Sequence, residues 1–203
     1  MSRAPEDTVI ATYEAHAEEL RSRYDQVATE DVLSPVFDLM PTQANILEVG
    51  AGSGRDTCWL ADRGHAVTAV EPVAAFREAI VARAPNATVV DARLPCLAAV
   101  TGSFDLILVN AVWHHLPETS RKSSFARLAK LLQPGGRLFL SLRHGPAAPG
   151  QPVHILNPDA EILQAKAGRL RLLRRVAAPS RQKVNIAAGV TWIWLVFEKE
   201  RLK

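Results

Sequence analysis

The sequence contains little of what would assign it to a disulfide-rich, metal-binding or membrane-spanning class. Only two of its 203 residues are cysteine, and the separation of Cys58 from Cys96 matches no metal-ligand spacing. A chain of this length can bury a stable core without disulfides, which favours the reducing cytoplasm. No apolar run approaches the roughly 20 residues that span a bilayer, and the polar residues 1–7 do not predict a signal peptide. We therefore expect a cytoplasmic protein that engages no membrane and has no metal site.

An excess of charge of either sign is absent as well. The formal net charge is only +3, with 22% of the residues charged. The one local imbalance lies between residues 166 and 183, where seven Lys and Arg occur with no Asp or Glu. We interpret this stretch as the solvated faces of a helix and a strand, with an anionic partner as the alternative. Nucleic acid is therefore not the favoured partner.

Strands and helices alternate regularly along the first 142 residues. Short apolar runs predict five strands, at 46–49, 67–70, 88–91, 104–110 and 137–142. The segments between them have the composition of helices. This alternation predicts βαβ units, and hence a mainly parallel sheet with helices on both faces.

Both ends of the chain differ from this pattern. Residues 6–40 carry apolar side chains at three- and four-residue spacing, which predicts helices. The C-terminal part is predicted to contain a Pro- and Gly-rich loop, a helix, a strand, a loop and a last strand, at 145–152, 158–167, 170–177, 179–189 and 191–198. The loop between the last two strands can reverse the chain, so we expect them to pair antiparallel.

The most specific pattern is Ile46–Gly54, a short apolar strand that leads into three glycines spaced two residues apart. Glycine allows a tight turn after a strand, and a ligand can lie directly on a main chain that carries no side chains. The helix that follows presents free N–H groups suited to a negatively charged ligand group. Position 55 is Arg, so the pattern is E-x-G-x-G-x-G and not the dinucleotide fingerprint G-x-G-x-x-G. A plain tight turn is the alternative for this motif alone.

Polar residues follow four of the predicted strands at the edge where ligands of open parallel sheets bind. They are Glu71 after the second strand, Asp91-Ala92 after the third, Asn110 to His115 after the fourth and Arg143-His144 after the fifth. An acid at the end of the second strand can accept hydrogen bonds from a ribose diol. Each acid alone could be a helix cap or a solvated side chain, but all fall at the same edge. With the glycines, they predict a site for a nucleoside-type ligand.

Taken together, these segments resemble a class I S-adenosylmethionine-dependent methyltransferase, over nearly everything from about residue 8 to the end of the chain. The matching pieces, in order, are Ile46–Gly54 with Arg55-Asp56, Val67–Pro72, Asp91 through Pro95, Phe104–Pro117 and Leu131–Leu142. The resemblance implies a Rossmann-like α/β fold: a seven-stranded, mostly parallel sheet with an antiparallel last strand, helices on both faces and an N-terminal helical cap. It implies one domain over 1–203, with the cap at 1–43, a cofactor-binding core at 44–142 and a substrate-side loop, helix and β-hairpin at 143–203.

The resemblance also implies S-adenosyl-L-methionine as the cofactor and S-adenosyl-L-homocysteine as the product. Three glycines would lie against the methionine part of the cofactor: Gly50, Gly52 and Gly54. Glu48 would reach its ammonium group, directly or through water. The backbone carbonyl of Asn110 would accept a hydrogen bond from the same ammonium.

Further residues would hold the nucleoside part. Glu71 would bind both ribose hydroxyls, and the adjacent Pro72 belongs to the same site. Asp91 would bind the adenine amino group, and the Ala92 N–H would face a ring nitrogen. We assign the closure over the cofactor to Tyr24. Three residues are candidates for this closure: Tyr13, Arg23 and Tyr24. For the two tyrosines, packing in the core is the alternative.

The reaction requires little more than placement. The sulfonium methyl group of this cofactor is electrophilic without help from the protein, so catalysis depends on holding the acceptor in line with the leaving sulfur. A general base is needed only if the acceptor must lose a proton early. We assign this role to His114 and His144, because histidine takes up a proton near neutral pH. For His115 a structural role is favoured, since His114-His115-Leu116-Pro117 resembles a frequent structural element of the family.

The absence of two motifs disfavours two classes of methyl acceptor, both of them nucleobases. The fourth strand continues as Asn110-Ala111-Val112-Trp113 and not as the Asn/Asp-Pro-Pro-Tyr/Phe of many DNA amino-methyltransferases. No Cys lies in the loops after the fourth and fifth strands, which disfavours covalent attack on a pyrimidine. We therefore expect a small-molecule acceptor, bound by Trp113, Arg143 and Arg181. It would be anionic if Arg143, Arg181 and Lys183 point inward. A monomer and a homodimer both remain open.

Three alternatives remain. The enzyme could methylate RNA or a protein side chain, using the basic stretch near the C-terminus. It could bind S-adenosylmethionine without catalysis, as a regulatory protein or a partner subunit. A nicotinamide oxidoreductase is disfavoured by the missing G-x-G-x-x-G fingerprint.

Overall fold

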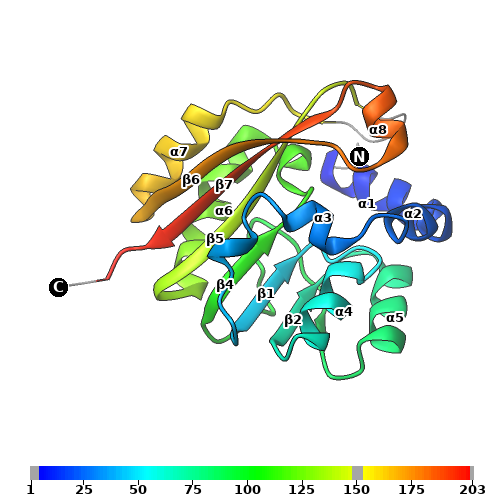
Figure 1. Ribbon diagram of the computed structural model, residues 1–203, viewed down its shortest axis with the longest axis horizontal. Helices are drawn as coiled ribbons and strands as arrows, with labels where there is room; N and C mark the ends of the chain where they lie inside the picture. Colours follow the sequence, from blue (N-terminus) through cyan, green and yellow to red (C-terminus); the bar gives the residue numbers. More distant parts are fainter. Residues whose placement is uncertain (1–4, 148–152, 202–203) are drawn as a thin grey trace.

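Seven strands form one sheet in which the first and fourth strands lie side by side at the centre. The computed structural model describes residues 5–147 and 153–201. The strands are β1 (Asn45–Val49), β2 (Ala66–Val70), β3 (Thr88–Val90), β4 (Phe104–Val109), β5 (Leu132–His144), β6 (Leu170–Pro179) and β7 (Thr191–Lys199). Their order is β3-β2-β1-β4-β5-β7-β6 (Figure 1). β1 to β5 pair in parallel, and β7 is antiparallel to both of its neighbours. The order reverses between β1 and β4, which is where open α/β sheets bind their ligands.

Helices cover both faces of this sheet and one of its ends. They are α1 (Pro5–Ala15), α2 (Ala17–Tyr24), α3 (Thr29–Leu33), η1 (Phe37–Leu39), α4 (Arg55–Asp62), α5 (Ala74–Arg83), η2 (Trp113–His115), α6 (Glu118–Leu131), α7 (Pro158–Ala167) and α8 (Lys183–Ala187). α3 and α4 pack on one face, and α6 and α7 pack on the other. α1, α2 and α8 gather at one end of the molecule (Figure 1). No helix of the described residues is long and apolar enough to cross a bilayer.

The central strand β4 is buried on both faces, as its continuous apolar sequence predicts. Leu106 and Leu108 pack with α3 and α4, whereas Ile107 and Val109 pack with α6. All four side chains are fully buried. Burial of such a side chain stabilises the fold by about 1.5–3 kcal/mol. The sheet is therefore a rigid support for the loops at its carboxyl edge.

The N-terminal helices are attached to that edge by polar contacts. The Glu14 carboxylate of α1 accepts a hydrogen bond of 3.0 Å from the Ala74 N–H at the start of α5. A carboxylate is favourable there because a helix N-terminus carries positive partial charge. Asp7 of α1 pairs with Arg93, at 2.7 Å, in the segment after β3. The rings of Tyr13 and Tyr24 pack around Phe76 of α5. These contacts hold α1 and α2 over the carboxyl ends of β1 and β2.

The predicted strands and the antiparallel position of the last strand are confirmed, and two details differ. The helical region predicted at 6–40 is divided into α1, α2, α3 and η1. The division arises because Leu20 packs against α5 whereas Leu33 packs under α4, so one straight helix could not bury both. The predicted loop at 179–189 contains the short helix α8. Part of the predicted loop at 145–152 lies outside the described residues.

Candidate active site

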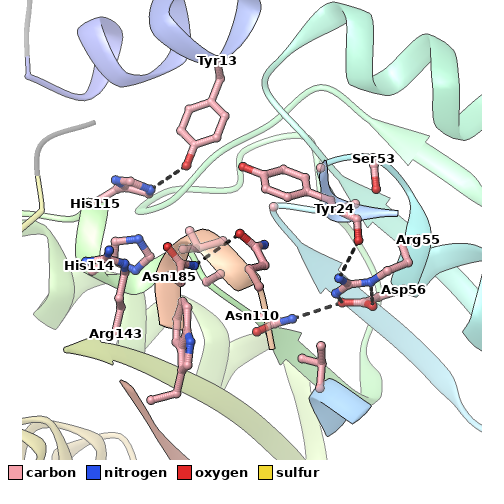
Figure 2. A pocket seen from close by; sticks show the side chains of 18 of the residues that line it. Tyr13, Tyr24, Ser53, Arg55, Asp56, Asn110, His114, His115, Arg143 and Asn185 are labelled. Atoms are coloured by element: carbon pink, nitrogen blue, oxygen red, sulfur yellow. Dashed lines mark hydrogen bonds and ion pairs between the residues drawn. The ribbon is translucent and has the colours of Figure 1, made fainter. Parts of the chain in front are cut away.

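A cavity of about 530 Å³ lies at the carboxyl edge of the sheet, below α1, α2 and α8. It is lined by the loop after β1, the ends of β2, β4 and β5, and the β6–β7 hairpin. Such a volume lies within the range of about 300–1,000 Å³ that is typical of small-molecule sites. Figure 2 shows two sides, that of Asp56 and that of His114, with Asn110 between them. We call them the glycine-loop side (Glu48, Gly50, Gly52, Asp56 and Glu71) and the histidine side (His114, His115, Arg143 and Trp192).

Two glycines of the loop after β1 serve different purposes. Gly54 has a φ of +78°, and a Cβ there would come within 2.8 Å of Ile80 Cγ1, so this glycine lets α4 approach α5. It does not line the cavity. Gly52 has a φ of +55°, and a Cβ there would meet only the Tyr24 ring among the described residues, at 3.8 Å. Gly52 and Gly50 line the cavity, but a Cβ on Gly50 would clash with the Val112 side chain, so a ligand can approach the bare main chain at Gly52.

Asp56, the second residue of α4, is the centre of a buried polar cluster. It accepts hydrogen bonds from Thr29 Oγ1 at 2.7 Å, from Arg55 Nε at 2.7 Å and from Asn110 Nδ2 at 3.1 Å. Burial raises the pKa of Asp56, but the Arg55 charge and these hydrogen bonds together hold it below its ordinary value. Asp56 is therefore an ionised carboxylate inside the protein. It connects α3, α4 and the end of β4.

Glu48 of β1 lies beside this cluster and lines the cavity. It is 3% exposed and accepts a hydrogen bond from Thr57 Oγ1. Burial and the neighbouring charge of Asp56 raise the pKa of Glu48 far above its usual range. A cation bound nearby would reverse this effect and stabilise the ionised carboxylate.

Glu71 stands at the end of β2 with both carboxylate oxygens facing main-chain donors. Oε2 accepts from the Gly52 N–H at 2.8 Å, and Oε1 accepts from the Val73 N–H at 2.9 Å. Burial raises the pKa of Glu71 to about 7, against the opposing effect of these hydrogen bonds. Pro72 lines the same part of the cavity. The Glu71 carboxylate is thus fixed in orientation before any ligand binds.

The structure does not bring the side chain of Asp91 to the cavity. This side chain is 66% exposed and pairs with Arg77 of α5 at 3.0 Å. Arg77 also donates to the carbonyls of Glu71 and Pro72, at 3.0 and 2.7 Å. These contacts fix the Arg77 guanidinium, and with it the Asp91 carboxylate, outside the cavity. Its neighbour Ala92 does line the cavity, as does Leu94.

Asn110 is held rigidly between the two sides of the cavity. Its Nδ2 donates to Asp56, and its Oδ1 accepts from Ser141 Oγ of β5 at 3.0 Å. The same Ser141 Oγ accepts from the Ala111 N–H at 2.8 Å. Ala111 has a φ of +58°, a left-handed conformation that is costly for a residue with a Cβ. This turn directs the chain after β4 into η2, which carries His114 and His115.

Two tyrosines cover the cavity from the N-terminal helices. Tyr24 lies over Gly52, and Tyr13 Oη lies 3.0 Å from His115 Nε2 in a hydrogen bond (Figure 2). Burial and the neighbouring Tyr24 raise the pKa of Tyr13 far above its ordinary value, so Tyr13 stays protonated. Its hydroxyl can therefore orient His115 but cannot act as a base near neutral pH.

His114 is 4% exposed, and its Nδ1 has no hydrogen-bond partner among the described residues. Burial and the charges of His115 and Arg143 hold the pKa of His114 far below its usual range. His114 is therefore neutral at physiological pH. The ring of His114 lines the cavity, although its Nδ1 is itself covered by protein atoms.

Two predicted site residues point away from the cavity. Trp113 was expected to bind the acceptor, but its side chain is fully buried, packs on Phe125 and donates from Nε1 to Glu161 at 2.8 Å. His144 was expected to be catalytic, but it does not line the cavity. Successive residues of a strand face opposite sides, so Arg143 can face the cavity only if His144 does not. Both expectations are therefore wrong.

Three arginines line the cavity without forming an ion pair in the described part of the chain: Arg23, Arg143 and Arg181. Arg143 donates to the Gly145 carbonyl at 3.2 Å, and Arg181 to the Asp31 carbonyl at 3.3 Å. By contrast, the lining residues Arg55 and Arg93 pair with Asp56 and Asp7. Arg143 and Arg181 thus line the cavity, which is the condition under which an anionic acceptor is expected.

Other lining residues were missed in the sequence. Trp192 and Trp194 come from β7, more than 80 residues beyond β4 in the chain. Nothing in their sequence spacing indicates a site. Ser141 could have been noticed, because it is the only polar residue within the run Leu138–Leu142 of β5.

Known proteins with similar sequences are methyltransferases. Residues 46–136 match the model of a family described as a methyltransferase domain. A protein of Oceanobacillus iheyensis is 28% identical over 130 residues, which are 64% of this chain and 58% of that protein. A protein of Bacillus licheniformis is 32% identical over 137 residues, 67% of this chain and 61% of that protein. Both are named uncharacterized methyltransferases, and this chain spans about three fifths of their length.

Solved structures with the same fold include a methyltransferase bound to a small molecule. It is the Burkholderia thailandensis 1,6-didemethyltoxoflavin-N1-methyltransferase, with bound 1,6-didemethyltoxoflavin and S-adenosylhomocysteine. Its TM-score is 0.77 at 20% sequence identity, over 99% of this chain and 92% of that chain. The similarity confirms the predicted Rossmann-like class I fold.

Proposed function

We propose that the chain is a class I S-adenosylmethionine-dependent methyltransferase, which transfers a methyl group from S-adenosyl-L-methionine to a small-molecule acceptor. The observation that carries this proposal is the glycine-loop side of the cavity. There the open main chain at Gly52 donates to the buried Glu71, and the buried Glu48 lines the same cavity. No similar arrangement of buried acids surrounds the cavity elsewhere in the described residues.

The charges of this side fit the cofactor. Its positively charged ammonium group would lower the pKa of Glu48, which burial and the ionised Asp56 raise, and would so stabilise the Glu48 carboxylate. Its ribose hydroxyls can donate to Glu71, whose oxygens each retain a lone pair after accepting from the main chain. The Asn110 carbonyl is a second acceptor for the ammonium, and the lining residues Ala92 and Leu94 would face the adenine.

The residues of the histidine side would place the acceptor. When bound, the cofactor supplies an electrophilic methyl group. Placement of the acceptor atom in line is then the main contribution of the protein. His114 lines the cavity and is kept neutral by its depressed pKa, so it would orient an acceptor hydroxyl or N–H but would be a weak general base. Tyr13 and His115, which share a hydrogen bond of 3.0 Å, line the cavity beside His114.

A small acceptor is favoured over RNA or a protein side chain. The cavity has the volume of a small-molecule site. The basic stretch near the C-terminus is partly neutralised, since three of its seven cations, Arg171, Arg174 and Arg175, pair with Glu198, Asp38 and Asp159. Binding to tRNA at low salt, weakening steeply as salt rises, would overturn this preference.

The test is a titration of the protein with S-adenosylhomocysteine, followed by turnover with methyl-labelled S-adenosylmethionine and a panel of small acceptors. Saturable binding with label transfer to a small molecule supports the proposal. Binding without transfer to any acceptor would favour a non-catalytic cofactor-binding protein. Absence of binding would overturn the proposal itself.

A further inference from the structure

A row of aromatic rings forms one wall of the cavity on its histidine side. Tyr13 meets His115 edge to face, with ring centroids 5.7 Å apart. His115 and His114 lie 4.1 Å apart, and His114 meets Trp192 at 5.9 Å. The row thus runs from α1 through η2 to β7, three elements far apart in the chain. All four rings line the cavity.

The polar groups beside this wall lack partners that similar groups elsewhere possess. His114 is nine-tenths buried or more, with Nδ1 unbonded in the described part of the chain. Arg143 lies next to it (Figure 2) and forms no ion pair with a described carboxylate. Arg55, on the glycine-loop side, has the carboxylate of Asp56 at 2.7 Å. The histidine side therefore has an uncompensated guanidinium where the glycine-loop side has a complete ion pair.

The chemistry of an occupant follows from these two features. Flat rings stack or meet edge to face with other aromatic rings, with centroids about 4.5–7 Å apart. A guanidinium presents its N–H groups as a fork that matches a carboxylate. Partial burial lowers the pKa of Arg143, which reflects the cost of keeping this cation away from water. A bound anion would offset that cost.

We propose that the methyl acceptor is a planar aromatic molecule with an acidic group, which lies along His115, His114 and Trp192 and places its anionic group on Arg143. This inference rests on the proposed function and names its acceptor class. The acceptor atom then lies beside His114, between the ring wall and the glycine-loop side. An aliphatic acid would meet Arg143 but not the rings, and a neutral aromatic would meet the rings but not Arg143.

The experiment measures the binding of three matched probes to the protein saturated with S-adenosylhomocysteine. 4-Hydroxybenzoate is planar and anionic, 4-hydroxybenzamide is planar and neutral, and 4-hydroxycyclohexanecarboxylate is anionic but not planar. We expect the first to bind with a dissociation constant at least about tenfold lower than either of the others, the size of one lost charge-assisted hydrogen bond. Calorimetry or equilibrium dialysis gives all three values.

Two variants assign the effect to residues. Arg143→Gln should remove the preference for the benzoate over the benzamide, and Trp192→Leu should remove its preference over the cyclohexane acid. Arg171→Gln is the matched control, because Arg171 lies outside the cavity and pairs with Glu198. This control should leave all three constants unchanged.

Each failure has a distinct meaning. If S-adenosylhomocysteine does not bind, the proposed function fails and the acceptor class fails with it. If S-adenosylhomocysteine binds but the three probes bind equally, or none binds, the acceptor class alone is overturned. Unchanged preference in Arg143→Gln would likewise overturn the assigned contact.

Discussion

The two sides of the cavity differ in how their polar groups are satisfied. On the glycine-loop side, Asp56 and Glu71 each accept at least two hydrogen bonds from described residues. On the histidine side, Arg143 has no carboxylate partner and His114 Nδ1 has no partner at all in the described part of the chain. A pre-ordered side suits a ligand that is always the same, such as a cofactor. On the histidine side, the charge of Arg143 remains available to the acceptor.

The largest effect is expected from a substitution that disrupts the polar contacts of the glycine-loop side. Asp56→Ala leaves Arg55 buried without its partner and removes an acceptor from Thr29 and Asn110. Removing one member of a buried ion pair costs about 3–5 kcal/mol. We expect the free energy of unfolding to fall by about this amount in urea titrations.

The control for this loss is Glu198→Ala, which breaks an ion pair with the exposed Arg171 on the strand surface. Surface pairs contribute about 0–1 kcal/mol. Equal losses in both variants would show that the Asp56 cluster has no special role in stability.

The second effect is the pH dependence of the ligand-free protein. Burial raises the pKa of Glu71 from 4.5 to about 7, so the folded state binds more protons than the unfolded state between these values. Stability from this group is therefore present below pH 4.5 and is lost as pH rises through 7. At 1.36 kcal/mol per pKa unit, the loss is about 3 kcal/mol.

Glu71→Gln isolates this contribution, because other groups such as His114 titrate in both proteins. We expect the difference in unfolding free energy between wild type and variant to change across pH 5 to 8. The wild type should become less stable relative to the variant as pH rises. A pH-independent difference would contradict the buried, protonated state of Glu71. Urea titrations at four pH values provide the data.

The third effect concerns cofactor affinity. Glu71→Ala removes the predicted ribose contact and should weaken S-adenosylhomocysteine binding by about 1.5–3 kcal/mol, the range for hydrogen bonds to a charged group. Asp91→Ala should have a smaller effect, since the Asp91 carboxylate lies outside the cavity on Arg77. Calorimetry distinguishes the two variants. A larger loss in Asp91→Ala would mean that this side chain turns inward on binding.

The smallest effect concerns the exposed edge of the histidine side. Among the described residues, the exposed Arg181 donates to the backbone carbonyl of Asp31 and forms no ion pair. Arg181→Glu should therefore raise the dissociation constant of 4-hydroxybenzoate only a few-fold, corresponding to about 0.2–1 kcal/mol. An effect as large as that of Arg143→Gln would move the anionic group of the acceptor toward α8. No change would remove Arg181 from the acceptor site.

The same contrast explains what the sequence could predict. The glycine-loop side is built from one continuous segment and the ends of two adjacent parallel strands, so the spacing of Gly52 and Glu71 was enough to find it. The histidine side depends on the pairing of β5 with β7, which sets Trp192 opposite Arg143. No local pattern encodes that register.

Side-chain direction was the other source of error. Trp113 and His144 were expected in the cavity because they follow strands at the correct edge. Trp113 turns into the core because Glu161, on α7, accepts its N–H, and His144 alternates with Arg143 on β5. Neither contact can be deduced without the packing of distant elements.

The most direct test of the account is a crystal structure of the protein with S-adenosylhomocysteine. We expect the ribose to bind Glu71 and the methionine part to lie over Gly52. An open space bounded by His114, Arg143 and Trp192 should lie beside the sulfur. A ligand bound elsewhere, or a sulfur that faces away from His114, would contradict the account.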